Sequence, residues 1–169
     1  MRKVLKLNKK RDIIFWLMEK YMQAALEEAE IAAAEGEVPV GAAIVENGEV
    51  IARAHNRTEA ENDPTAHAEM LAIREAAKKR GWTRLSGCSL YVTVEPCAMC
   101  AGACVWARLD EVVYGAADPK AGAMGSLMDI PAVPGLNHRL TVRGGLLEEE
   151  CSLVMKRFFA QKRAERRNR

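Results

Sequence analysis

The segment from Glu95 to Cys100, Glu-Pro-Cys-Ala-Met-Cys, places the strongest constraint on how this chain can fold. It follows an apolar, β-prone run at residues 89–94 and leads into an alanine-rich stretch that is typical of a helix. Pro96 is expected at the start of that helix, where its missing N–H has no partner to lose. Cys97 and Cys100 then lie one turn apart, near the positive end of the helix dipole, which favours thiolates. The sequence therefore predicts a strand-to-helix junction that presents two thiolates side by side.

A second motif lies upstream, with the sequence Asp63-Pro-Thr-Ala-His-Ala-Glu69. Asp63 is expected to cap a helix whose first residue is Pro64, which puts His67 in the opening turns. His67 and Glu69 are two residues apart, or about 200° around a helix, so they cannot both point at one metal ion. We therefore interpret His67 as a metal ligand and Glu69 as an acid/base group beside the metal.

The two motifs together indicate a catalytic zinc site. His67, Cys97 and Cys100 supply three protein ligands, and a fourth position left open for water distinguishes catalytic from structural zinc. The pattern H-x-E…P-C-x-x-C is the signature of zinc-dependent deaminases. Two alternatives remain open: a structural zinc site, and a redox dithiol, because a lone C-x-x-C also occurs where a strand meets a helix.

The other cysteines and histidines have simpler interpretations. Cys104 shares the helix face of Cys97, but it lies about 10 Å further along the axis and is expected in the core. Cys88 and Cys151 are also expected to be structural. His55 and His138 are interpreted as hydrogen-bonded residues near loops.

Hydrophobic periodicity predicts a three-layer α/β/α fold, in which a mixed five-stranded sheet is flanked by helices. Asn47-Gly48 indicates a hairpin, and two successive strand–helix–strand crossovers predict parallel neighbouring strands. The predicted helix that contains His67 is expected to face inward with Ala66, Met70, Ile73 and Ala77. The expected strands are 38–45, 50–55, 90–94, 111–114 and an edge strand at 140–143. The expected helices are 17–35, one from Pro64 to Gly81, one from Pro96, and 146–163. A polar loop is expected after residue 55, and a long loop over 116–138.

Composition and charge place the chain among single-domain proteins that act inside the cell. The 169 residues predict one domain, an odd number of five cysteines argues against a secreted disulfide scaffold, and no apolar run could cross a bilayer. Residues 1–12 carry six basic side chains and one acidic, residues 156–169 carry seven and one, and the body between them is acidic. We expect a cytoplasmic location, because the apolar run after the basic N-terminus is too short for a signal peptide.

Five stretches resemble the family of bacterial tRNA adenosine deaminases. The zinc motif alone marks only the wider cytidine deaminase-like superfamily, whereas Asp118-Pro-Lys120 and the Gly-Ser-Leu-Met-Asp sequence narrow the resemblance to the tRNA enzymes. The similarity runs from about Met18 to the end of the last predicted helix. The stretches are Val38-Pro-Val-Gly-Ala42, Ala54-His-Asn-Arg57, Asp63 to Glu69, Glu95 to Ala103, and Gly122-Ala-Met-Gly-Ser-Leu-Met-Asp129.

The resemblance implies a cytidine deaminase-like fold, a homodimer, and hydrolytic deamination of the wobble adenosine of a tRNA anticodon to inosine. It implies that one zinc ion activates the attacking water and that Glu69 transfers the protons. It also implies roles in substrate binding for the following residues: Asn56 at the flipped base, Asp118 and Lys120 in the loop beside the RNA backbone, and Phe158 and Phe159, with the basic residues after them, near the anticodon stem-loop.

Some of these positions have a second interpretation. Asn56 is also common at strand ends for reasons of turn geometry, and Asp118 could simply cap its loop against Lys120. Residues 1–17 extend beyond the usual family start. They are either an added basic arm or the result of a start codon assigned upstream of Met18. Residues 18–169 form the expected domain. Two rival functions remain: a deaminase of free bases or nucleosides, which shares the zinc residues, and a non-catalytic zinc or redox protein, which has no use for Glu69.

Overall fold

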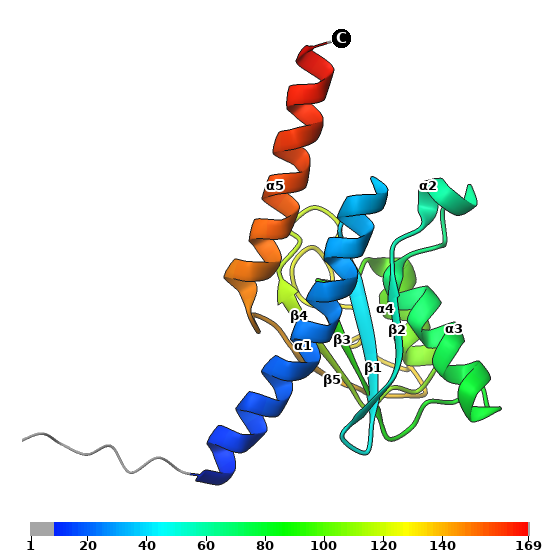
Figure 1. The fold of residues 1–169 in the computed structure, drawn as a ribbon. Coiled ribbons are helices and arrows are strands. Elements are labelled where there is room, and N and C mark those ends of the chain that lie inside the picture. Colours follow the sequence, from blue (N-terminus) through cyan, green and yellow to red (C-terminus); the bar gives the residue numbers. More distant parts are fainter. Residues whose placement is uncertain (1–8, 169) are drawn as a thin grey trace, which may run out of the picture.

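The computed structural model describes residues 9–168, which form a mixed five-stranded sheet between two layers of helices (Figure 1). This three-layer arrangement confirms the predicted fold class. The strands are β1 (Gly41–Glu46), β2 (Glu49–His55), β3 (Cys88–Val94), β4 (Glu111–Ala116) and β5 (Thr141–Arg143), in the order β2-β1-β3-β4-β5. The helices are α1 (Lys9–Glu35), α2 (Thr58–Glu61), α3 (Ala68–Arg80), α4 (Ala98–Trp106) and α5 (Glu148–Arg167).

The hairpin at Asn47-Gly48 forms as predicted. Both residues have positive φ, 51° and 83°, which matches the twist of the antiparallel pair β1 and β2. β3 lies at the centre of the sheet, as its apolar sequence predicted. β5 lies at one edge, as predicted for residues 140–143.

The prediction of parallel neighbours holds for only one of the two crossovers. β3 and β4 are joined through α4 and pair in parallel. The crossover through α3 joins β2 to β3, but β1 lies between these two strands and is antiparallel to both. The hairpin causes this difference, because β1 already occupies the inner side of β2.

Two helices cover each face of the sheet: α1 and α5 on one side, α3 and α4 on the other (Figure 1). The predicted inward face of α3 is only partly correct: Ala66 is fully buried and Ile73 and Ala77 pack against the core, but Met70, Ile73 and Ala77 are themselves only partly buried. Small side chains let α3 lie close to the sheet, while the larger ones flank it. The buried residues of α3 are Ala68, Glu69, Ala72 and Ala76.

The ends of several helices differ from the prediction. α1 begins at Lys9 rather than near Leu17, so it includes residues 9–17 of the predicted extension; residues 1–8 lie outside the described residues. α2 was predicted as part of a polar loop. Gly36 and Gly81 end α1 and α3 with positive φ, as expected of C-caps. Within residues 9–168, no helix has the length and apolar character that crossing a membrane requires.

Candidate active site

His67 and Cys97 occupy equivalent positions at the starts of two helices. His67 is the N-cap of α3 and Cys97 the N-cap of α4, both with extended backbone. The helices therefore begin later than predicted, and Pro64 and Pro96 lie outside them. Asp63 instead closes a short turn, in which its Oδ1 accepts hydrogen bonds from the backbone N–H and the hydroxyl of Thr65, both at 2.7 Å.

The structure brings His67, Cys97 and Cys100 together at one point. Nδ1 of His67 lies 3.8 Å from Sγ of Cys97 and 3.6 Å from Sγ of Cys100, and the three ligand atoms all lie within 4.8 Å of one another. In tetrahedral zinc coordination, a nitrogen and a sulfur ligand are about 3.6 Å apart. The donor set and its spacing therefore fit a zinc ion without rearrangement. Cys104 is fully buried and lies outside this cluster.

The thiols of this cluster are polarised by each other. Hydrogen bonds from Cys100 and then from His67 lower the pKa of Cys97 to about 3, while the bond to Cys97 raises the pKa of Cys100. The hydrogen bond with Cys97 also raises the pKa of His67. These contacts favour the thiolate form of Cys97, and a bound cation would release the proton of the second thiol.

Glu69 lies in the first turn of α3 and is only 3% exposed. Its Oε2 has no hydrogen-bond partner among the described residues, and burial raises the pKa of the carboxyl group. An unpaired carboxyl oxygen in this position is costly for stability, which is typical of a group retained for chemistry.

A cavity of about 260 Å³ opens beside these residues, and Asn56 and Asp118 line it together with His67, Glu69 and Cys97. Asn56 is buried, and its Oδ1 accepts the backbone N–H of Ala68 at 2.9 Å. With one lone pair of its oxygen engaged, Asn56 retains its two amide N–H donors for a ligand. The remaining walls are mainly apolar, with Thr58 and Glu95 as polar members; the apolar residues are Val38, Val40, Val94, Ala121 and Met155.

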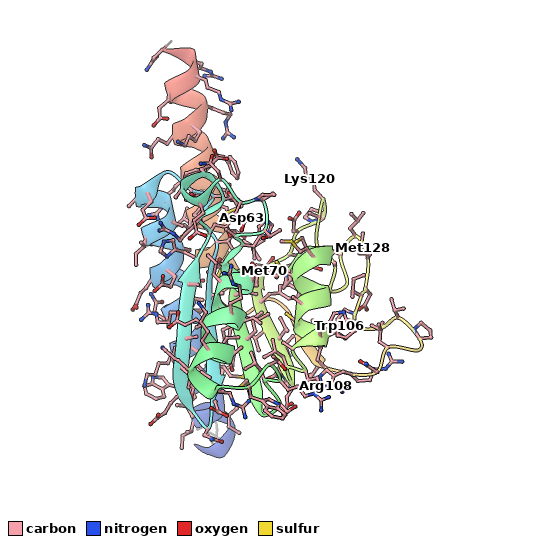
Figure 2. All side chains as sticks on the ribbon, turned by 90° about the vertical axis from the view of Figure 1, so that its right-hand side faces the viewer. Asp63, Met70, Trp106, Arg108, Lys120 and Met128 are labelled. Carbon is pink, nitrogen blue, oxygen red and sulfur yellow. The ribbon has the colours of Figure 1, made fainter. Side chains whose placement is uncertain are left out.

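Asp118 caps its own loop. One carboxylate oxygen, Oδ1, accepts the backbone N–H groups of Lys120 at 2.9 Å and Ala121 at 3.1 Å. This is the arrangement that the loop-capping interpretation required, although the cavity position also suits substrate contact. Lys120 is exposed, and its side chain points away from the body of the protein (Figure 2).

Glu95 is a site residue that the sequence interpretation missed. It is 3% exposed, and its carboxylate accepts the N–H groups of Asp118, Met124 and Ser126 at 2.9–3.0 Å and the hydroxyl of Ser126. Burial raises the pKa of Glu95, but these hydrogen bonds, that of the Ser126 side chain above all, outweigh it and hold the pKa below its ordinary value. A charged residue directly after a buried central strand is the sequence signal that could have revealed it.

A basic groove adjoins the cavity at Val38, which lines both. Phe158 is buried and Phe159 exposed, with ring centroids 5.4 Å apart, and Nζ of Lys162 lies 5.4 Å from the centroid of the Phe158 ring. The groove is completed by Gly36, Glu59, Arg163 and Arg166. It thus combines aromatic rings with basic side chains.

Known proteins share this sequence and this fold. Residues 18–163 match the family model of MafB19-like deaminases. The tRNA-specific adenosine deaminase of Bacillus subtilis is 51% identical over 154 residues, which cover 89% of this chain and 96% of that protein. The enzyme of the same name from Aquifex aeolicus is 48% identical over 140 residues, or 83% of this chain and 93% of that protein.

The chain belongs to the family of tRNA-specific adenosine deaminases. It is therefore a deaminase, with the cytidine deaminase-like fold. A structure solved for studies of A-to-I editing by tRNA:A34 deaminases at the wobble position matches this deaminase with a TM-score of 0.78 and 47% identity, covering 80% of this chain and 98% of that one. The guanine deaminase of Nitrosomonas europaea matches it with a TM-score of 0.72 and 28% identity, covering 84% of each chain. The same scaffold is thus shared with an enzyme named for a free base.

Proposed function

We propose that this deaminase converts the wobble adenosine of a tRNA anticodon to inosine by hydrolysis. The observation that carries the proposal is the meeting of His67, Cys97 and Cys100 beside the unpaired carboxyl group of Glu69 in one cavity. The tRNA substrate is supported by the names of the relatives and by the basic, aromatic groove that continues from the cavity.

Zinc is the metal that best fits two thiolates and one imidazole, and when bound it lowers the pKa of a water molecule toward neutrality. The free oxygen of Glu69 can accept a proton from the attacking water and pass it to the adenine ring nitrogen. The carbon that bears the amino group then becomes electrophilic and forms its bond to the water oxygen. Glu69 transfers the second proton to the amino group, whose C–N bond breaks to release ammonia and leave inosine.

Asn56 is proposed to recognise the flipped base. One lone pair of its oxygen is held by Ala68, which leaves its amide N–H groups as donors for the base. Purine ring nitrogens such as N7 are acceptors and suit this donor. The hydrogen bond to Ala68 also fixes the position of Asn56 relative to the start of α3, and hence relative to His67 and Glu69.

Four further residues are proposed to bind the RNA around the flipped base. Asp118 and Lys120 lie in the loop at the cavity mouth, where a ribose and its phosphate would pass. Phe158 and Phe159 lie in the groove with Lys162, and aromatic rings between cations are suited to stacked bases and phosphates. Binding should therefore weaken as salt concentration rises.

A homodimer and a cytoplasmic location complete the proposal. Trp106, the last residue of α4, is 79% exposed, and Met128, in the loop after β4, is 42% exposed (Figure 2). Large apolar side chains grouped on a surface favour contact with another protein surface. Replacing Trp106 with Ser should shift the mass measured by light scattering from two chains to one, if this side of α4 forms the interface.

A single experiment separates this function from deamination of a free base. The purified protein is incubated with an anticodon stem-loop that carries adenosine at the wobble position, and inosine is measured; a stem-loop with adenosine elsewhere serves as control. Inosine formed only at the wobble position supports the proposal. Ammonia released from free guanine or adenosine, with no inosine in either RNA, would instead support the activity suggested by the guanine deaminase likeness.

A further inference from the structure

Glu37 is among the most buried charged residues of the chain, although it lies outside the cavity. It is 1% exposed and follows Gly36, between the end of α1 and the start of β1. Its carboxylate accepts hydrogen bonds from the Thr58 hydroxyl at 3.2 Å, from the Glu59 N–H at 3.1 and 3.3 Å, and from the Ala60 N–H at 2.8 Å. All of these donors belong to the first turn of α2.

α2 depends on Glu37 for its position. The helix has only four residues, none of them is buried, and its N-cap residue, Arg57, makes no capping bond with its side chain. A helix this short does not form by itself in water. The charged acceptor of Glu37 satisfies N–H groups that would otherwise have no partner at the helix start, and bonds of this kind are the stronger ones.

α2 stands between the cavity and the basic groove. Thr58 lines the cavity with His67 and Glu69, whereas the next residue, Glu59, lines the groove with Phe158 and Lys162. Val38, the neighbour of Glu37, lines both. An RNA strand with one base in the cavity and adjacent nucleotides in the groove must therefore cross this boundary.

We infer that Glu37 is a positioning residue for the RNA substrate, an inference that rests on the proposed function. By holding α2, it fixes the boundary over which the strand enters the cavity, and it acts on the flanking nucleotides rather than on the base. Glu37 touches neither the metal ligands nor Glu69 in any hydrogen bond of the described residues, so its loss should leave the chemistry intact.

The test is Glu37→Gln, which keeps the shape of the side chain but removes its charge and replaces one acceptor with an NH₂ group. We expect the KM for the anticodon stem-loop to rise about tenfold, with kcat within about twofold and zinc content unchanged. Amide hydrogen exchange at Glu59 and Ala60 should accelerate about tenfold or more, because the charge of their acceptor is lost and one of its two oxygens becomes an NH₂ group. Glu49→Gln, at an exposed carboxylate at the start of β2, is the matched control and should change none of these quantities.

Two results would overturn the inference: faster exchange in α2 with an unchanged KM, or a parallel loss of kcat and zinc, which would make Glu37 a general structural residue. If Glu37→Gln does not fold, Glu37→Asp keeps the charge on a shorter side chain, and the same KM and exchange shifts are expected at smaller size. A wild-type protein that forms no inosine would overturn the proposed function as well, whereas a KM unchanged in an active enzyme overturns only the role of Glu37.

Discussion

The metal-binding part of the site and the walls around it are fixed by different kinds of interaction. His67, Cys97 and Cys100 occupy the first residues of α3 and α4, which pack on the same face of the sheet. The walls are α2 and the loop at residues 118–126. Each is attached through one buried carboxylate, Glu37 or Glu95, which accepts several backbone N–H groups.

This difference separates metal binding from substrate binding. A helix start is held by the whole packing of its helix, so the metal ligands keep their spacing when a wall moves. A wall held by a few hydrogen bonds can shift without disturbing the core. Changes in the metal part should therefore abolish activity together with metal or chemistry, while changes in the walls should alter substrate use and leave the metal in place.

The largest effect is expected from removing a metal ligand. Cys97→Ala or Cys100→Ala should lose zinc and deaminase activity together, because two remaining ligands do not form a stable site. Cys104→Ala should retain about one zinc per chain and its activity, since Cys104 lies outside the cluster. Metal analysis of the purified variants beside inosine formation decides this. A Cys104→Ala protein without zinc would show that the ligand assignment is wrong.

Glu69→Gln tests the chemistry with the metal in place. The substitution keeps the side-chain shape but cannot carry a proton, so activity should fall by about 10²–10⁴-fold or more with normal zinc content. The unpaired oxygen of Glu69 suggests that folding stability will not suffer, because neutral Gln is easier to bury than a carboxylate. Measurement of kcat and of the melting temperature covers both points; turnover close to wild type would exclude Glu69 as the proton carrier.

A wall can be displaced without replacing any ligand through Gly122, although Gly122 forms an isolated β-bridge with Cys97. A Cβ atom at this position would overlap the Glu95 carboxylate and lie 2.5 Å from the Asp118 carbonyl oxygen. Gly122→Ala should therefore shift the loop, lower kcat/KM on the RNA by about tenfold and destabilise the fold by about 1–3 kcal/mol, with zinc retained. Gly102→Ala on α4 is the control, because a Cβ there meets nothing within 4 Å. It should leave kcat/KM, stability and zinc content close to wild type. Loss of zinc from Gly122→Ala would contradict the separation of the two parts.

The same difference explains what could be predicted from the sequence. The sheet, the hairpin and the meeting of His67 with the two cysteines follow from periodicity and from motifs that are local in the chain. The exact helix starts could not be predicted, because proline is compatible both with the first turn of a helix and with the segment that precedes the helix. The inward face of α3 was only partly predicted, because alanine gives a weak hydrophobic signal beside Met70 and Ile73.

The walls could not be predicted from local pattern. Glu37 and Glu95 receive hydrogen bonds from residues 21–31 positions away in the chain. No periodicity connects an acceptor to donors at such distances. α2 was missed for a related reason, because a helix with no buried residue has no apolar stripe to detect.

The smallest effect is expected at Asp118, where the wall meets the sugar of the substrate. Asp118→Asn can keep both hydrogen bonds to the loop, since Lys120 and Ala121 donate to a single oxygen that Asn also has. What the substitution removes is the charge, and with it the stronger, charge-assisted bond that a carboxylate can accept from a ribose 2′-hydroxyl. A difference of about 1 kcal/mol corresponds to roughly a fivefold shift in the ratio of RNA to DNA activity.

Matched RNA and DNA anticodon hairpins therefore separate the two interpretations of Asp118. On DNA, the wild-type carboxylate has no 2′-hydroxyl to bind and repels nearby phosphates. If Asp118 contacts the sugar, Asp118→Asn removes both penalties and raises activity on the DNA hairpin relative to RNA. Zinc content and melting temperature should stay unchanged, since the loop bonds persist. Asp129→Asn, in an exposed carboxylate further along the same segment, should leave the ratio unaltered. An unaltered ratio for Asp118→Asn as well would make Asp118 a loop cap, and sugar recognition would then have to come from elsewhere in the wall.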